Sequence, residues 1–322
     1  MLYRGLKVIV RLAMVVFCRK IIINKPALLK EKGPLLLACN HPNSFLDAVI
    51  VDALFDQPVY SLARGDVFKK HFYFKLLGAL KMLPVYRVSE GVENLSNNYQ
   101  TFEACKEIFS NTGVVLMFSE GKCINEWHLR PLKKGTARLA LASWDENIPL
   151  KVLPVGINYS SFRKFGKNIF INFGEIIEKK DIPDISNADG IRHQAFNSLL
   201  EDQLKHLVFE IKNDDLKTKQ QLLGKKPAVV EKILLMIPAI GGFILHAPLY
   251  FAVKSFTWQR TKDNDHYDSI ITALLLFTYP FYLLLIVIIA FLFIKNWLVL
   301  LMLLLIPFMA WSCVQLKPQL DK

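Results

Sequence analysis

The sequence predicts an α/β protein with a mixed, largely buried sheet flanked by helices, an interfacial N-terminal helix and C-terminal transmembrane helices. Three observations predict this fold class. Short apolar runs alternate with amphipathic stretches over residues 26–210, which is typical of strands alternating with helices. Hydrophobic residues form 52% of the 322-residue chain, too many for a wholly soluble protein. Most of this excess lies after residue 232, in long stretches without charge.

Residues 1–25 are expected to form an amphipathic helix in the membrane interface. Arg4, Lys7 and Arg11 recur at helical spacing among Leu, Val, Ile and Met. Arg19 and Lys20 would then lie at the lipid headgroups. The alternative is a helix packed on the following domain, with its basic side chains in water.

Residues 26–210 form the predicted α/β domain, and residues 211–232 are expected to be a linker or a helix. Period-two and buried apolar patterns predict strands at residues 34–40, 58–63, 81–87, 113–121, 150–159 and 168–177. Helical periodicity predicts helices at residues 44–55, 67–80, 92–111, 133–147 and 191–212. Functional residues are expected on the loops at the strand ends.

Residues 233–322 are the predicted membrane region. Residues 270–294 and 297–314 are each long enough to span a membrane, which takes about 20 residues. Only Lys295-Asn296 separates them, so a hairpin is expected. Residues 233–253 contain two prolines and paired glycines, and they form either a re-entrant element or a third span. The positive-inside rule favours the re-entrant form, with the α/β domain and the basic residues on the cytoplasmic side of a hairpin-anchored or multi-pass protein.

Charge and cysteine content narrow the class of partner. The formal net charge of +12, most of it before residue 233, favours an anionic membrane surface or phosphate-bearing substrates. Nucleic acid is disfavoured, because zinc-ligand spacing, aromatic RNA signatures and basic helices with heptads are missing from the sequence. The five scattered cysteines predict neither a disulfide framework nor a metal site.

The stretch "NHPNSFLD" places His41 just after a predicted strand and Asp47 in the first turn of a helix. A histidine with an orienting carboxylate can act as a general base. Alternatively, Ser44 and Asp47 only cap the helix. Six positions along a helix turn the chain by about 600°, so the two side chains would not share a helical face. They meet only if residues 41–43 form a non-helical loop, which Pro42 favours.

Charged residues also occur at other strand ends and ahead of a predicted helix. Basic groups in such positions are what a phosphate anion needs, although each alone is more often a solvated surface charge. These residues are Arg87, Glu120, Arg130, Lys133 and Lys134.

Taken in order, the motifs resemble those of the glycerolipid acyltransferases, which include glycerol-3-phosphate and 1-acylglycerol-3-phosphate acyltransferases. The resemblance covers residues 35–156. "NHPNSFLD" is similar to the family's His-Asp motif, "LPVYR" to its second block, "FSEG" to its third and "LPVG" to its fourth, with "RPLKKG" similar to its basic-glycine stretch. A catalytically silent lipid-binding scaffold would have little reason to keep both His41 and Asp47.

The resemblance implies a role for each matching residue. His41 would remove the proton from an acceptor hydroxyl as its oxygen attacks an acyl thioester, and Asp47 would orient the imidazole ring. Glu120 and Gly121 would shape the acceptor site. Phosphate would be held by Arg87, Lys133 and Lys134.

Three departures from the family pattern bear on the acceptor. The aspartate follows the histidine by six positions instead of five, as in the branch resembling fungal-type glycerol-3-phosphate and dihydroxyacetone-phosphate acyltransferases. Ser119 replaces a proline, and Lys122-Cys123 replaces threonine-arginine. Lys122 or Arg130 would then supply the missing positive charge. Cys123 is expected to be inert.

The sequence therefore predicts a membrane-bound O-acyltransferase of phospholipid biosynthesis. Acyl-CoA or acyl-ACP (acyl carrier protein) would be the co-substrate, with no bound cofactor or metal. The acceptor would be glycerol-3-phosphate or dihydroxyacetone phosphate. Lysophosphatidate or another lysophospholipid is the alternative acceptor, and a non-catalytic membrane scaffold is the alternative of another class. The expected partners are membrane lipids and, if the donor is acyl-ACP, acyl carrier protein.

Overall fold

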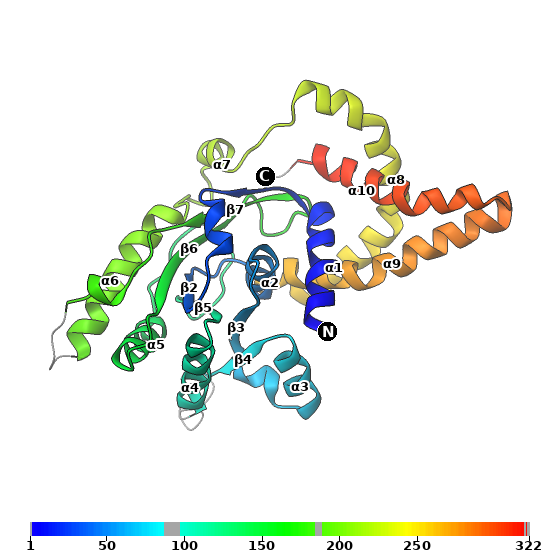
Figure 1. Ribbon diagram of the computed structural model, residues 1–322. Helices are drawn as coiled ribbons and strands as arrows, with labels where there is room; N and C mark the ends of the chain where they lie inside the picture. Colours follow the sequence, from blue (N-terminus) through cyan, green and yellow to red (C-terminus); the bar gives the residue numbers. More distant parts are fainter. Residues whose placement is uncertain (1, 87–96, 184–188, 319, 321–322) are drawn as a thin grey trace.

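The computed structural model describes residues 2–86, 97–183, 189–318 and 320. Within these residues a seven-stranded sheet has the order β1-β7-β6-β2-β5-β3-β4 (Figure 1). Neighbouring strands run parallel except β6 and β7, so the predicted α/β class with a mixed sheet is confirmed. The strands are β1 (Cys18–Ile23), β2 (Leu35–Cys39), β3 (Val59–Arg64), β4 (Met82–Val85), β5 (Val114–Phe118), β6 (Lys151–Tyr159) and β7 (Lys167–Phe173). The helices are α1 (Leu2–Phe17), α2 (Phe45–Leu54), α3 (His71–Ala79), α4 (Asn97–Ser110), α5 (Lys134–Asp145), α6 (Asp189–Leu207), α7 (Leu216–Leu222), α8 (Val229–Thr261), α9 (Tyr267–Ile294) and α10 (Met302–Leu316).

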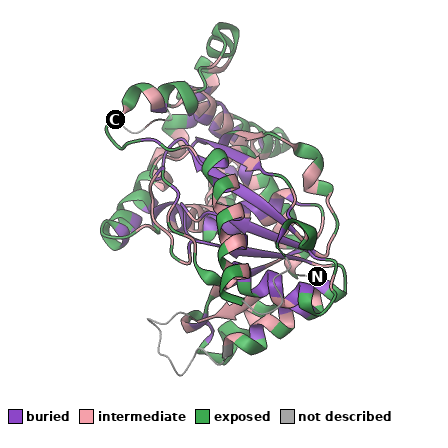
Figure 2. Cartoon of the chain, turned by 90° about the vertical axis from the view of Figure 1, so that its left-hand side faces the viewer, coloured by how far each residue is buried: buried purple, intermediate pink, exposed green. Residues whose placement is uncertain are grey.

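Helices cover both faces of the sheet. Alternate residues of β2 point to opposite faces, so Leu37 joins a core with α1 and α2, whereas Leu36 joins a core with α4, α5 and α6. All five residues of β2 are fully buried, as expected for a central strand covered on both sides. Figure 2 shows the same pattern, with buried residues concentrated in the strands.

A single interfacial helix was expected for residues 1–25, but the structure has a helix followed by a strand there. The helix α1 ends at Phe17, and β1 follows directly as an edge strand parallel to β7. The run Ile21-Ile22-Ile23 explains the change, because β-branched side chains favour strands and β7 offers an unpaired edge. Arg19 is therefore buried at the domain, where headgroup contact was expected.

The basic side of α1 faces the domain, which neither predicted orientation anticipated. Lys7 pairs with Asp52 at 3.4 Å, and Arg11 Nε donates to the carbonyl oxygen of Ala53 at 2.6 Å. These partners lie in the last turn of α2, where cations complement the negative end of the helix dipole. The opposite side of α1 is apolar and exposed, through Leu2, Val8, Ile9, Leu12 and Val15.

The C-terminal region contains three helical segments that are long and apolar enough to cross a membrane, namely Val229–Thr261, Tyr267–Ile294 and Trp297–Leu316. Residues 233–253 lie within one continuous helix, α8, which contains Pro238 and Pro248. A proline loses only one backbone hydrogen bond, which a long helix can absorb by bending. Figure 1 shows α8 bent, and α9 and α10 projecting from the domain as a hairpin.

The helix α8 could span a membrane by its length; it packs mainly on α10 and α9 and contacts the domain in its C-terminal half. Near its middle, the ring of Tyr250 is 6.1 Å from that of Phe165 in the β6–β7 loop. Near its end, the guanidinium of Arg163 lies 5.1 Å from the ring of Trp258. These two contacts hold the C-terminal half of α8 against the β6–β7 loop.

Candidate active site

The carboxyl ends of β2, β5 and β6 form one edge of the sheet, because β2 pairs in parallel with both other strands. His41 follows β2, Gly121 follows β5, and Tyr159 ends β6. Asn40 joins two of these strand ends: its carboxamide donates to Ile157 O at 3.0 Å and accepts from Ile157 N at 2.7 Å. The backbone before His41 is therefore fixed to the sheet.

His41 and Asp47 meet at this edge. His41 Nδ1 lies 2.9 Å from Asp47 Oδ2, and the Asp47 side chain is completely buried. The imidazole stacks on the ring of Phe118, with the centroids 3.8 Å apart and the planes 11° apart. Because a carboxylate only accepts hydrogen bonds, Nδ1 carries the proton and Nε2 is left for a substrate.

Two further donors fix Asp47. Tyr159 Oη donates to Oδ1 at 2.6 Å, and the backbone N–H of Asn43 donates to Oδ2 at 2.8 Å. Burial, with the nearby Asp47 charge, holds the pKa of Tyr159 well above its usual value, so its hydroxyl stays a donor. Tyr159 was missed by the sequence reasoning, although a polar aromatic residue at the carboxyl end of a strand beside β2 was a usable signal.

The non-helical loop that the His41–Asp47 pair requires is present. Ser44 has φ 53° and ψ −146°, a conformation that L residues rarely adopt, and α2 begins only after it. The predicted capping box is wrong, since the Ser44 side chain makes no cap hydrogen bond. Its hydroxyl instead lies 2.7 Å from His266 Nδ1, and its N–H donates to Cys123 Sγ at 2.8 Å.

Cys123 therefore stabilises the loop before α2 by accepting the hydrogen bond from the Ser44 backbone N–H. Burial raises the pKa of its thiol, which keeps the thiol neutral. The replacement of a family arginine by this cysteine places a small acceptor next to the strained Ser44. The other departure, Ser119, accepts from Thr136 Oγ1 at 3.0 Å and so connects the end of β5 to α5.

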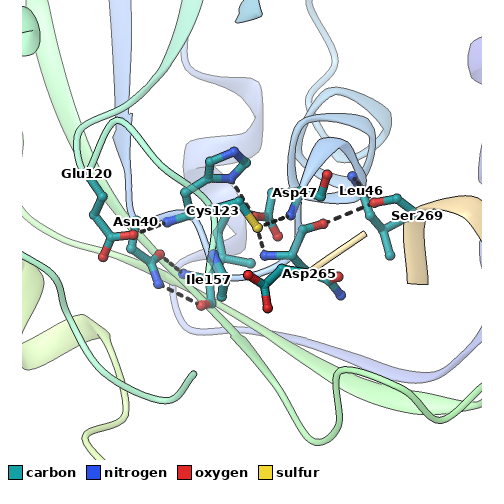
Figure 3. Close-up of polar contacts among 12 residues, drawn as sticks. Asn40, Leu46, Asp47, Glu120, Cys123, Ile157, Asp265 and Ser269 are labelled. Atoms are coloured by element: carbon teal, nitrogen blue, oxygen red, sulfur yellow. Dashed lines mark hydrogen bonds and ion pairs between the residues drawn. The ribbon is translucent and has the colours of Figure 1, made fainter. Parts of the chain in front are cut away.

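Figure 3 shows the Glu120 carboxylate turned towards the backbone, and Glu120 is not among the residues that line the neighbouring cavity. Its two carboxylate oxygens accept from His41 N at 2.8 Å and from Arg130 N at 2.9 Å. Only 4% of the residue is exposed, and burial raises the pKa of its carboxyl from 4.5 to about 7, partly opposed by these two donors. Glu120 thus braces the loop instead of lining the expected acceptor site.

A large cavity of about 2530 Å³ opens beside His41. Of the predicted site residues, Gly121, Lys122, Lys133 and Lys134 line it. Gly121 has φ +68°, and a Cβ there would lie 3.0 Å from the Lys133 side chain, so the turn favours glycine. Lys133 and Lys134 stand at the N-terminus of α5, where the helix dipole also favours an anion.

Another predicted phosphate ligand, Arg130, is not in this wall. The guanidinium of Arg130 pairs with Glu126 at 2.9 Å and is not among the residues that line the cavity. Arg87 lies outside the described residues. His266 and Arg64 do line the cavity, and the sequence reasoning singled out neither. In the part of the chain that the structure describes, no group of three or more His, Cys, Asp or Glu is placed to hold a metal ion.

Comparison with known proteins identifies the family. The Acyltransferase family model matches residues 20–158, which include His41, Asp47, Glu120 and the cavity residues Lys122, Lys133 and Lys134. Residues 20–158 are therefore similar to the Acyltransferase family, which supports the predicted glycerolipid acyltransferase family, whereas the branch with the longer His-Asp spacing stays a prediction. A solved structure, the 1-acyl-sn-glycerophosphate (LPA) acyltransferase PlsC from Thermotoga maritima, is 16% identical with a TM-score of 0.40, covering 63% of this chain and 79% of that one. No curated protein gave a significant sequence match.

The raised pKa of Glu120 predicts a pH dependence of stability. Between pH 4.5 and about 7 the folded state binds more protons at this carboxyl than the unfolded state, so its contribution to stability falls as the pH rises. Relative to Glu120→Gln, which does not titrate, the melting temperature of the wild-type chain should decline across this window. Thermal unfolding of both detergent-purified chains measures the difference, and a difference that stays flat or rises with pH would contradict the assignment.

Proposed function

We propose that this chain is a membrane-bound O-acyltransferase of phospholipid biosynthesis. It moves a fatty acyl group from acyl-CoA or acyl-ACP to a hydroxyl of glycerol-3-phosphate or dihydroxyacetone phosphate. The single observation that carries the proposal is the His41–Asp47 pair, which is buried on its carboxylate side and borders a cavity with lysines in its wall.

The proposed reaction uses His41 as the general base. Nε2 removes the proton from the acceptor hydroxyl while the oxygen attacks the thioester carbonyl carbon. The tetrahedral intermediate then breaks its C–S bond, and the imidazolium returns the proton to the departing thiolate. The products are an ester and a free thiol. Asp47 keeps Nδ1 protonated and stabilises the imidazolium charge.

The cavity wall supports a phosphate-bearing acceptor and a lipid product. Lys122, Lys133 and Lys134 offer ammonium donors on the same side as Gly121. Apolar residues of α1 and α9, among them Val10, Met14, Ala273 and Phe277, line another part of the cavity and suit an acyl chain. The same apolar wall supports the second candidate acceptor, lysophosphatidate or another lysophospholipid.

We further propose that α9 and α10 cross the membrane as a hairpin, whereas α8 lies along the membrane on the side of the domain. The contacts of Tyr250 and Trp258 with the domain support this arrangement. At the end of the hairpin, Lys164 Nζ hydrogen-bonds to the carbonyl oxygen of Leu320, so the chain returns to the domain. The basic residues next to the domain support a cytoplasmic position for it. The exposed apolar face of α1 would enter the same interface.

Replacement of the proposed base tests the function. His41→Ala should lower kcat/KM by about 1000-fold, the range typical of a lost general base. The assay gives the purified chain in lipid vesicles a labelled acyl thioester and, separately, glycerol-3-phosphate, dihydroxyacetone phosphate or lysophosphatidate. His128→Ala is the matched control, because that histidine is exposed and pairs with Glu210. Unchanged acyl transfer by His41→Ala would contradict the proposed mechanism.

The hairpin topology predicts which positions a membrane-impermeant maleimide reaches. In sealed proteoliposomes selected for an outward-facing domain, Lys262→Cys should react, since it follows α8 on the domain side. Lys295→Cys, at the end of α9, should react only after detergent opens the vesicles. Peptide-resolved mass spectrometry separates these sites from the native cysteines. Labelling of Lys295→Cys in sealed vesicles would exclude the hairpin.

A further inference from the structure

The segment that joins α8 to α9 lies against the loop that carries His41 and Asp47. We name residues 265–269 the α8–α9 junction. It lies outside the range matched by the family model and 222 to 226 positions from its partners in the loop. Its first contacts are those of Asp265 Oδ1 with Asn125 N at 3.2 Å and of His266 Nδ1 with Ser44 Oγ at 2.7 Å. A residue of the C-terminal region, His266, thus holds the strained Ser44 in place.

Asp268 is the buried centre of this junction. Its Oδ2 accepts from Asn43 Nδ2 at 2.8 Å and forms an ion pair with Lys167, whose side chain is fully buried. A charged pair in such a dry site is retained only where each charge is balanced and hydrogen-bonded. Because Lys167 begins β7, the ion pair connects Asp268 to the sheet, and Asp268 in turn fixes the Asn43 side chain.

Asn43 transmits this constraint to the proposed catalytic pair. Its side chain is held by Asp268, and its backbone N–H donates to Asp47 Oδ2 at 2.8 Å. That oxygen is the one that His41 Nδ1 contacts. A displacement of Asn43 would therefore move the acceptor that sets the orientation of the imidazole ring.

Ser269 adds a second connection, at the start of α2. Its hydroxyl accepts from Leu46 N at 3.2 Å and donates to the Asn43 carbonyl oxygen at 3.3 Å (Figure 3). The first N–H groups of a helix need an acceptor from outside the helix. Ser269 provides one, where the local residue Ser44 does not. The junction thus supports both the loop before α2 and the turn that contains Asp47.

We propose that the α8–α9 junction, through Asp268 and Ser269, positions the His41–Asp47 pair for catalysis. The C-terminal helices are then part of the active-site scaffold as well as a membrane anchor. This inference rests on the proposed function, since it assigns positioning residues to that same site. Asp265, His266 and Ser269 of the junction line the cavity, whereas Asn43 and Asp268 do not, so the Asn43–Asp268 contact acts through orientation and leaves substrate affinity unchanged.

The variant Asn43→Ala tests this with little disturbance. It removes the contact with Asp268 but keeps the backbone N–H to Asp47 and the Lys167–Asp268 ion pair. We expect kcat to fall about tenfold, because one buried hydrogen bond no longer fixes the loop, while both KM values stay within about twofold. Ser269→Ala should act in the same direction and provides a second test if Asn43→Ala does not fold.

The matched control is Thr278→Val, also on α9, whose hydroxyl bonds to Leu274 O of its own helix. It should leave kcat unchanged. The inference is overturned if Asn43→Ala and Ser269→Ala, folded with melting temperatures near that of the control, keep wild-type kcat while His41→Ala is inactive. A rise in KM at constant kcat would overturn it as well. An active His41→Ala would instead overturn the proposed function, and this inference with it.

Discussion

His41 and Asp47 are six positions apart, and their side chains meet only because the chain between them leaves helical geometry. Residues around the loop therefore hold it in this non-helical conformation. Ser44 takes a φ of 53°, a conformation that costs about 1–3 kcal/mol in general and persists only where neighbouring contacts impose it. Cys123 and His266 provide those contacts. Glu120 and Asn40 fix the backbone on the other side of the histidine.

The same requirement gives a structural reason for the departures from the family pattern. In the turn before α2, the Ser44 side chain does not cap the helix. Cys123, in the place of an arginine, and Ser269, from a region that the family model does not match, satisfy the N–H groups that this turn leaves open. Arg130 is paired with Glu126, whereas Lys122, Lys133 and Lys134 line the cavity.

Much of the fold could be predicted from the sequence because it is encoded locally. All the strands from β2 to β7 were predicted from their apolar runs, and the loop after β2 from Pro42 and the His41–Asp47 spacing. The sequence did not predict β1, because its apolar residues also fit the end of a helix. Only the unpaired edge of β7, which exists in the folded sheet, favours a strand there. Tyr159, Lys167 and Asp268 could not be assigned, since their partners lie far away in sequence and only the folded sheet brings them together. The orientation of α1 likewise depends on the carbonyl groups at the end of α2.

The central claim is that His41 and Asp47 act as one unit in proton transfer, and a double-mutant cycle on kcat measures this most directly. Asp47→Asn alone should lower kcat by about 100-fold, because the imidazole loses its orienting acceptor. In a chain that already carries His41→Ala, Asp47→Asn should lower the residual kcat no further. If Asp47→Asn lowered kcat by the same factor in both backgrounds, the two residues would act independently, and the mechanism proposed for this site would be contradicted.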